Sequence, residues 1–432
     1  MKHAYKTSSP ILIELSLTNQ CNHRCVHCYN PQRILLPEEE KIEDIRNKID
    51  FIIAQLVENE IWDVVLTGGE PLTNMPLLKD VIKQLTDASI DVSLNSNLTL
   101  MTANFAQELK EECKLNGLIL TSLPSPVSET CDLITQSPGS FNRIVKGIDV
   151  STSNGLKVGI NMVVSKQNID ELDSLCDFVE SHNIDYVALS AAIPPDYDQY
   201  NQNYVLSKDD YQKIADTLYY INKKTGISVG TLTPLPLCIL DNPSKYWKIC
   251  SSRCMAGVTH AAINGVTGAF FACSHSNMTY GNVLTDGLKK CWDNVVGWDD
   301  DILLNDECRK CKWLHVCGGE CRILTKIKGQ AYCLDNEVIN IDEGVKYAPI
   351  SNVDRFRLSG SFKTRVEKGY SYVRINNRDH LVKNYVVHLL EIMKQYDEWF
   401  NVTILSDYVS NKELLRSVLQ ILESQKIIER VL

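Results

Sequence analysis

The sequence has 432 residues, of which 44% are hydrophobic, and this is enough chain for two or three domains that each bury a core. The formal net charge of -10 argues against general affinity for nucleic acid or anionic membrane, because that affinity comes mainly from excess Lys and Arg. The chain shows neither a secretory signal nor an apolar run of about 18 residues, so we expect a cytoplasmic protein whose partners are small molecules or protein.

Sixteen cysteines in a cytoplasmic chain point to metal ligands rather than disulfides, because the cytosol keeps thiols reduced. Eleven of them form two groups, which are Cys21, Cys25 and Cys28 near the start and Cys250, Cys254, Cys273, Cys308, Cys311, Cys317, Cys321 and Cys333 after the middle. The other five are isolated, and we expect ordinary small residues at Cys113, Cys131, Cys176, Cys238 and Cys291.

From residue 11 to about 235, short β-rich runs alternate with helix-period segments such as 38–59 and 76–88. This alternation predicts βα units and a parallel sheet. The expected strands are 11–17, 63–69, 91–97, 117–123, 157–164 and 186–193. Six strands predict an α/β fold with a partial (β/α)6 TIM-like barrel, whose ligand site lies at the carboxyl ends of the strands.

The first cysteine group, Cys21, Cys25 and Cys28, directly follows the first expected strand. Three thiolates so close in sequence can bind three irons of a 4Fe-4S cube and leave the fourth iron without a protein ligand. The alternative is a zinc site of three cysteines completed by His23 or His27.

The CxxxCxxC spacing, with Tyr29 following it, resembles the cluster motif of the radical S-adenosylmethionine (SAM) superfamily. The resemblance implies that the methionyl amine and carboxylate of SAM chelate the open iron, and that Tyr29 lies beside the cofactor. It also implies that an electron from the cluster breaks the sulfonium bond and yields a 5'-deoxyadenosyl radical. Iron-sulfur potentials reach about -700 mV, so such an electron is within their range.

Three more segments at strand ends strengthen this resemblance. Gly68, Gly69 and Glu70 match the family's GGEP motif, in which the glycines let the backbone approach the methionyl amine and the carboxylate receives it. Asn97 resembles the ribose-contacting residue, and Ser122 resembles the serine that contacts the methionyl carboxylate. The plainer alternatives are a simple turn at GGEP and polar strand ends that face water. The residues after Ser122 depart from the family's SLDGP segment, which leaves the substrate contacts of that loop open.

The second cysteine group resembles the seven-cysteine SPASM extension of peptide-modifying radical enzymes, with Cys250 as an added ligand. The resemblance implies two auxiliary 4Fe-4S clusters, one held by Cys250, Cys254, Cys273 and Cys321 and the other by Cys308, Cys311, Cys317 and Cys333. The alternative is one or two structural zinc sites, although zinc cannot accept the electron that an oxidative bond formation releases.

The residues after Cys273 separate this chain from one branch of the family. The sulfatase-maturing branch has a basic Asp at that point, whereas this chain has Ser274 and His275, so sulfatase maturation is a minor alternative. His275 is the candidate proton acceptor, but a His beside a cluster also serves as a hydrogen-bond donor to it.

The expected domains are a barrel over 1–235, a SPASM domain over 236–340 and a winged-helix-like module over 345–432. The last resembles the RiPP recognition element that binds the leader of a precursor peptide by strand addition. Residues 351–432 hold 13 Lys or Arg against 10 Asp or Glu, a net of +3 that suits an acidic leader better than DNA. The apolar stripe of Val386, Leu389, Leu390 and Met393 predicts a helix face turned to the module's core.

Together these features predict a maturase that binds a ribosomal precursor peptide and installs a carbon-carbon or thioether crosslink with three 4Fe-4S clusters and SAM. A flavodoxin or ferredoxin is the expected reductant. The alternatives are a peptide epimerase, a radical enzyme acting on a sugar or other small metabolite, and an iron-sulfur redox sensor that binds DNA through the winged helix. GGEP argues against the sensor, which needs no site for a methionyl amine.

Overall fold

The computed structural model describes residues 6–30, 42–193, 204, 206–250, 253–298, 304, 306–311, 314–324, 349–376, 378–396, 398–409 and 411–431. The chain divides into two compact units, residues 1–339 and 340–432. Within the described ranges, no helix is long and apolar enough to cross a membrane.

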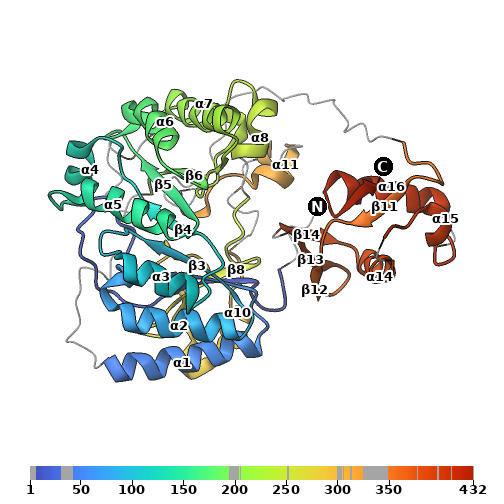
Figure 1. Ribbon diagram of the computed structural model, residues 1–432, viewed down its shortest axis with the longest axis horizontal. Coiled ribbons are helices and arrows are strands. Elements are labelled where there is room, and N and C mark those ends of the chain that lie inside the picture. The colour runs from blue at the N-terminus through green and yellow to red at the C-terminus, as the bar shows by residue number, and fades with distance from the viewer. Residues whose placement is uncertain are drawn as a thin grey trace. The chain divides into compact units, whose positions relative to one another are not determined.

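The first unit is built on a ten-stranded sheet in the order β10-β9-β8-β1-β2-β3-β4-β5-β6-β7 (Figure 1). Strands β1 to β8 run parallel where they pair, and β9 and β10 add antiparallel strands beyond β8. The strands are β1 Leu12–Ser16, β2 Asp63–Thr67, β3 Asp91–Ser96, β4 Ile119–Ser122, β5 Val158–Val164, β6 Tyr186–Ala191, β7 Ser228–Gly230, β8 His260–Asn264, β9 Ala269–Phe271 and β10 Thr279–Asn282.

Helices surround the curved sheet on its outer side (Figure 1). Helix α2 shows why they form: Asn74 caps its first turn, and Leu77, Leu78, Val81 and Ile82 recur on one face that is buried. The helices of this unit are α1 Ile42–Glu58, α2 Met75–Asp87, α3 Ala103–Glu111, α4 Ser128–Thr135, α5 Ser140–Ser153, α6 Leu172–Ser181, α7 Lys208–Thr225, α8 Pro243–Cys250, α9 Val283–Asp286, α10 Leu288–Asp293, α11 Asp306–Lys310 and α12 Leu314–Cys317, with the 3-10 turns η2 Pro71–Asn74, η3 Ile169–Glu171 and η5 Leu237–Ile239.

The predicted α/β class is confirmed, and the six expected strands appear in order as β1 to β6. The sequence did not reveal that the cysteine-rich segment contributes β8, β9 and β10 to the same sheet. Hydrophobic packing also continues into this segment, where Phe270 and Trp292 are fully buried. The barrel and the segment after it therefore share one core.

The parallel register brings the ends of neighbouring strands to one edge. Ser16 at the end of β1 pairs with Thr67 at the end of β2, and on its other side with Asn264 at the end of β8. Ser96, the last residue of β3, pairs with Thr121 in β4. The loops that follow these strands consequently start side by side.

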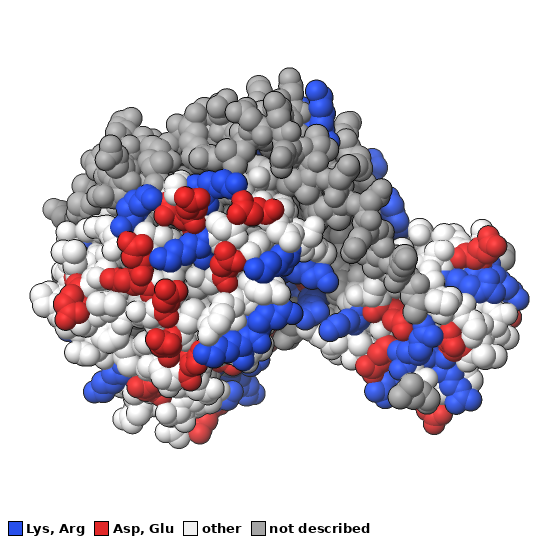
Figure 2. Space-filling model, turned by 90° about the horizontal axis from the view of Figure 1, so that it is seen from above, with Lys and Arg blue, Asp and Glu red and all other residues white. Residues whose placement is uncertain are grey.

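The second unit has a three-stranded antiparallel sheet in the order β12-β13-β14 and a separate β11-β15 pair. Its elements are β11 Arg355–Leu358, β12 Phe362–Val366, β13 Ser371–Ile375, β14 Arg378–Val382, α14 Asn384–Met393, α15 Val402–Leu405, α16 Lys412–Ser424 and β15 Ile428–Val431. The predicted stripe of α14 is buried in this unit's own core, which also contains Phe356, Val373 and Leu419. On the face shown in Figure 2, basic and acidic side chains are interspersed on both units.

Candidate active site

The first cysteine group lies in the loop that follows β1, which we call the cluster loop (residues 17–30). Cys21, Cys25 and Cys28 are all half-buried. The backbone N-H of His23 donates to Cys21 Sγ at 3.4 Å, and the N-H of Cys28 donates to the Cys25 carbonyl at 3.2 Å. The backbone donor to Cys21 Sγ would stabilise the negative charge of a thiolate bound to iron.

The middle of the cluster loop, at Arg24 and Val26, is hydrogen-bonded to the carboxyl end of α4. The backbone N-H groups of Arg24 and Val26 donate to the carbonyls of Thr135 and Ile134, at 3.0 and 2.9 Å. The Arg24 guanidinium folds back and donates to the Cys21 carbonyl at 2.7 Å. These bonds also satisfy terminal carbonyls of a helix, which need partners.

The start of the cluster loop, at Thr18 and Gln20, is hydrogen-bonded to the GGEP segment. Gly69 donates its N-H to the Thr18 carbonyl at 2.6 Å, and Glu70 donates to the Gln20 carbonyl at 2.7 Å. A methyl group on Gly69 would overlap the Gln20 carbonyl and lie 2.9 Å from the Asn19 carbonyl oxygen. Glycine is required here because backbone packs directly on backbone, one residue before Cys21.

Glu70 joins the ends of β2 and β3. Its Oε1 accepts hydrogen bonds from Leu72 N at 2.9 Å and Ser96 Oγ at 2.7 Å, while Oε2 accepts from Asn97 N at 2.7 Å. The residue is only 1% exposed. Burial raises its pKa, and these hydrogen bonds oppose the rise. In this structure the carboxylate therefore positions Asn97 as well as lying beside the glycines.

Asn97, the candidate ribose contact, is connected to the cluster loop. Its Nδ2 donates to Asn22 Oδ1 at 2.9 Å, and its Oδ1 accepts from the Thr99 hydroxyl at 2.7 Å. Asn22 Nδ2 in turn donates to Thr99 Oγ1 at 2.8 Å. Ser122 is exposed at the end of β4, on the same edge of the sheet. The candidate SAM contacts thus lie on adjacent strand ends around the cysteine loop.

The structure brings part of the second cysteine group together. Burial, followed by the neighbouring thiols of Cys254 and Cys321, raises the pKa of Cys273. Burial and then Cys254 raise the pKa of Cys321 to about 12. These are three of the four ligands expected for one auxiliary cluster. The fourth, Cys250, is fully buried, and burial and then Asp216 raise its pKa to about 12.

The other predicted auxiliary set is described in part. Cys311 and Cys308 are joined by a backbone hydrogen bond of 3.1 Å. Burial raises the pKa of Cys317, and Cys311 contributes to the rise. Cys333 lies outside the described residues. Within those residues, no three His, Cys, Asp or Glu side chains converge on a single ion site. In a cube each cysteine binds a different iron, so the thiols of Cys254, Cys273 and Cys321 need not converge on one point to hold a cluster, and both auxiliary clusters stay predictions.

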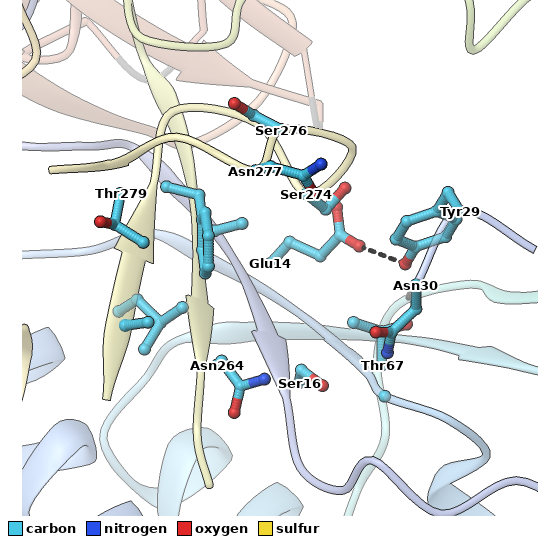
Figure 3. A pocket seen from close by; sticks show the side chains of 15 residues that line it. Glu14, Ser16, Tyr29, Asn30, Thr67, Asn264, Ser274, Ser276, Asn277 and Thr279 are labelled. Carbon is cyan, nitrogen blue, oxygen red and sulfur yellow. Dashed lines mark hydrogen bonds between the residues drawn. The ribbon is translucent and has the colours of Figure 1, made fainter. Parts of the chain in front are cut away.

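A cavity of about 260 Å³ lies beside the cluster loop (Figure 3). Its wall includes Glu14 on β1, Tyr29 directly after Cys28, and Ser274 directly after Cys273. The Tyr29 hydroxyl donates to Glu14 Oε1 at 3.2 Å, and Ser274 also hydrogen-bonds to Glu14. The remaining lining residues are Ser16, Asn30, Thr67, Gly68, Ala262, Ile263, Asn264, Ala269, Phe271, Ser276, Asn277 and Thr279.

His275 stacks on Tyr29 with ring centroids 4.2 Å apart. Its Nδ1 lies 4.0 Å from Cys273 Sγ. Burial lowers the pKa of His275 to about 4, so the imidazole is neutral at pH 7. This stack connects the residue after Cys28 with the loop that follows Cys273.

Sequence reasoning missed Glu14. An acidic residue inside a strand belongs to no motif, and only its position two residues before Ser16, on the less buried face of β1, distinguishes it. Burial is the main cause that raises the pKa of Glu14, while the hydrogen bonds from Ser274 and Tyr29 oppose the rise.

Comparison with known proteins identifies the first unit. Residues 15–179 match the profile of the radical SAM superfamily. The chain contains a radical SAM domain. This domain implies a 4Fe-4S cluster and SAM as cofactors, and the chain is a radical SAM enzyme. The assignments of individual ligands and contacts stay predictions.

Similar proteins extend beyond this domain. An AdoMet-dependent heme synthase of Methanosarcina barkeri is 26% identical over 333 residues, which cover 73% of this chain and 92% of the relative. Streptococcus suis SuiB bound to precursor peptide SuiA gives a TM-score of 0.57 at 18% identity, covering 74% of this chain and 73% of SuiB. The anSMEcpe structure with bound AdoMet gives 0.57 at 18% identity, covering 73% and 90%. The two structures share the radical SAM fold with this chain.

Proposed function

We propose that this radical SAM enzyme is a SPASM-type maturase that binds a ribosomal precursor peptide by its leader and installs a carbon-carbon or thioether crosslink in the core peptide. The supporting observation is the shared cavity wall. Tyr29 follows Cys28 and Ser274 follows Cys273, and both contact Glu14. A predicted auxiliary-cluster ligand therefore lies next to the cavity that the radical site faces.

This arrangement favours oxidative chemistry over epimerisation. When two side chains are joined, two hydrogens are lost. The deoxyadenosyl radical removes one as a hydrogen atom, and the other leaves as a proton and an electron. The enzyme therefore needs an electron acceptor near the substrate. The loop of Cys273 is next to the cavity, where such an acceptor is useful. An epimerase exchanges one hydrogen for another and has no electron to discharge.

The cofactors would be held by residues described above. Cys21, Cys25 and Cys28 would bind the cluster that holds SAM, and SAM bound there supplies a carbon radical. The backbone at Gly68 and Gly69 would approach the methionyl group, while Asn97, fixed by its side-chain bonds to Asn22 and Thr99, would contact the ribose. The two auxiliary clusters would use the second cysteine group, including Cys333. A flavodoxin or ferredoxin would supply electrons.

The leader would add as a strand to β14, an outer strand of the sheet in the second unit. Leu381 on β14 is 46% exposed and gives an apolar contact. Arg378 is exposed and forms no ion pair within the described part of this unit, so it suits an acidic leader. On the opposite outer strand, Arg365 is already paired with Glu367. SuiB, which has the same fold, was solved with its precursor peptide.

The decisive experiment is co-expression of the full chain with a candidate precursor peptide. We expect mass spectrometry to find a peptide that has lost two hydrogens, and tandem spectra to place a crosslink. Cys25→Ala should abolish both the mass change and 5'-deoxyadenosine formation. A peptide whose mass is unchanged in ordinary water, but which gains deuterium when the reaction is run in heavy water, would establish an epimerase instead and reject crosslinking.

Leader binding has its own matched pair of variants. Leu381→Glu on β14 should weaken binding of the leader peptide to the full chain at least tenfold in a fluorescence titration. Val366→Glu on β12, where the side chain is also exposed, should leave the affinity within twofold of wild type. If both variants weaken binding equally, or if neither variant weakens it, β14 is rejected as the leader site.

A second candidate is a radical enzyme acting on a small metabolite. It is favoured by the similarity to an AdoMet-dependent heme synthase, which covers 92% of that relative. Production of 5'-deoxyadenosine coupled to a heme precursor, without any peptide, would support it over the maturase.

A further inference from the structure

The cavity beside the cluster loop has an unusual charge balance. Among the described residues of its wall there is one carboxylate, Glu14, and no Lys, Arg or His. The other polar groups are neutral hydroxyls and amides. Figure 3 shows Glu14 among them, with its carboxylate turned toward Tyr29. The wall therefore offers neutral hydrogen-bonding groups and one negative charge, and its side chains provide no positive charge for an anionic group.

Glu14 is half-buried in the cavity wall, and the two groups that contact it, Tyr29 and Ser274, are neutral donors. A buried carboxylate is costly unless it is paired or well hydrogen-bonded. Tyr29 and Ser274 provide two hydrogen bonds, and a carboxylate has acceptor capacity for about four. An occupant that brings a positive charge or further N-H donors would complete the set.

The volume of the cavity limits the occupant. About 260 Å³ lies below the range of roughly 300–1,000 Å³ that is usual for drug-sized ligands. One extended amino-acid side chain fits this space. The wall contains apolar residues such as Phe271 and Ala262 as well as polar ones, which suits a chain with an apolar stem and a polar tip.

We infer that Glu14 is the specificity-determining residue of the cavity and receives the amine or guanidinium of a Lys or Arg side chain of the core peptide. This inference rests on the proposed peptide substrate. The carboxylate fixes the tip of the side chain, so the methylene stem is held where the deoxyadenosyl radical can remove a hydrogen atom. A Glu or Asp side chain would be repelled, because its charge would face Glu14 at short range with no cation from the wall.

The test uses three small probes whose side chains differ in charge: the N-acetyl methylamides of lysine, norleucine and glutamate. They are titrated against the full-length, anaerobically reconstituted enzyme with SAM, and dissociation constants are measured by ligand-observed NMR. We expect the lysine probe to bind at least tenfold more tightly than norleucine, and the glutamate probe to bind most weakly.

Variants tie the preference to one residue. Glu14→Gln should bind the lysine and norleucine probes equally. The exposed Glu111→Gln on α3 should keep the full preference. Equal binding of lysine and norleucine to wild type, a preference that survives Glu14→Gln, or no binding of any probe would each overturn the inference.

This test is separate from that of the proposed function. The probes carry no leader and form no crosslink, so a lysine preference without any modified peptide would reject the maturase and keep the role of Glu14. A crosslinked peptide without the lysine preference would keep the maturase and reject the role of Glu14.

Discussion

The contact between Gly69 and the cluster loop makes the sharpest prediction about the radical site. A methyl group in Gly69→Ala would lie 2.9 Å from the Asn19 carbonyl oxygen and overlap the carbonyl of Gln20. Comfortable contacts between carbon and its neighbours lie near 3.5 Å, so the backbone that leads into Cys21 must move by on the order of 1 Å. Both surfaces are backbone, and no side chain can rotate away.

Two effects follow from that shift. Overpacking of this kind costs about 1–3 kcal/mol of stability. A misplacement of about 1 Å at reacting groups can cost roughly 100-fold in rate. We therefore expect the dithionite-driven rate of 5'-deoxyadenosine formation to fall about 100-fold in reconstituted Gly69→Ala, with a modest loss of thermal stability.

Gly117→Ala is the matched control. A methyl group there would lie 2.8 Å from the Val92 carbonyl carbon, which is the same kind of backbone overlap, but at the amino end of the sheet. It should lose comparable stability and keep SAM cleavage within threefold of wild type. Equal loss of cleavage in both variants would show that general destabilisation, and not displacement of the cluster loop, explains the effect. Wild-type cleavage by Gly69→Ala would refute the close-approach argument.

Three further predictions concern buried groups. Glu70→Gln replaces one of two accepting oxygens by an N-H2 group that faces the donors from Leu72, Ser96 or Asn97, and leaving one of them unsatisfied should cost about 1–3 kcal/mol in chemical denaturation; a variant as stable as wild type would contradict it. Because burial raises the pKa of Glu14, its contribution to stability is present below the unfolded pKa of about 4.3 and is lost as the pH rises through the folded pKa. The melting temperature of Glu14→Gln should therefore gain on that of wild type as the pH rises above about 4.3, and a constant difference would refute this sign. In iron-free protein, iodoacetamide at pH 8 should modify the exposed Cys311 well before the buried Cys131, whose pKa burial raises to about 11, and reconstitution should protect only Cys311, as read by peptide mass spectrometry.

The sequence was informative where structure repeats a local pattern. The six barrel strands are predictable because each carries apolar residues at alternating or consecutive positions, as in Asp91–Ser96 and Val158–Val164. The strand-end motifs follow from the same logic, since parallel strands bring their carboxyl ends to one edge. By contrast, β9 has three residues and β10 contains Gly281, so neither carries enough periodic signal to be recognised as part of the sheet.

Contacts between distant segments were beyond sequence reasoning. The hydrogen bond from Tyr29 to Glu14 and the stack of Tyr29 on His275 join three parts of the chain that no spacing relates. The role of Glu70 as a link between two strand ends was also hidden, because the motif names the residue and not the donors that surround it. Motifs of this kind identify which residues act, while their mutual positions depend on the packing of the whole unit.

The position of Tyr29 suggests why the two cysteine groups belong to one site. Its backbone is fixed by the turn at Cys25 and Cys28, its ring packs on the residue that lies two positions after Cys273, and its hydroxyl is held by Glu14. A side chain that enters the cavity and binds Glu14 must therefore contact a group connected to both cysteine loops. Under the proposed function, substrate binding, radical formation and removal of the second electron would then depend on the same few contacts.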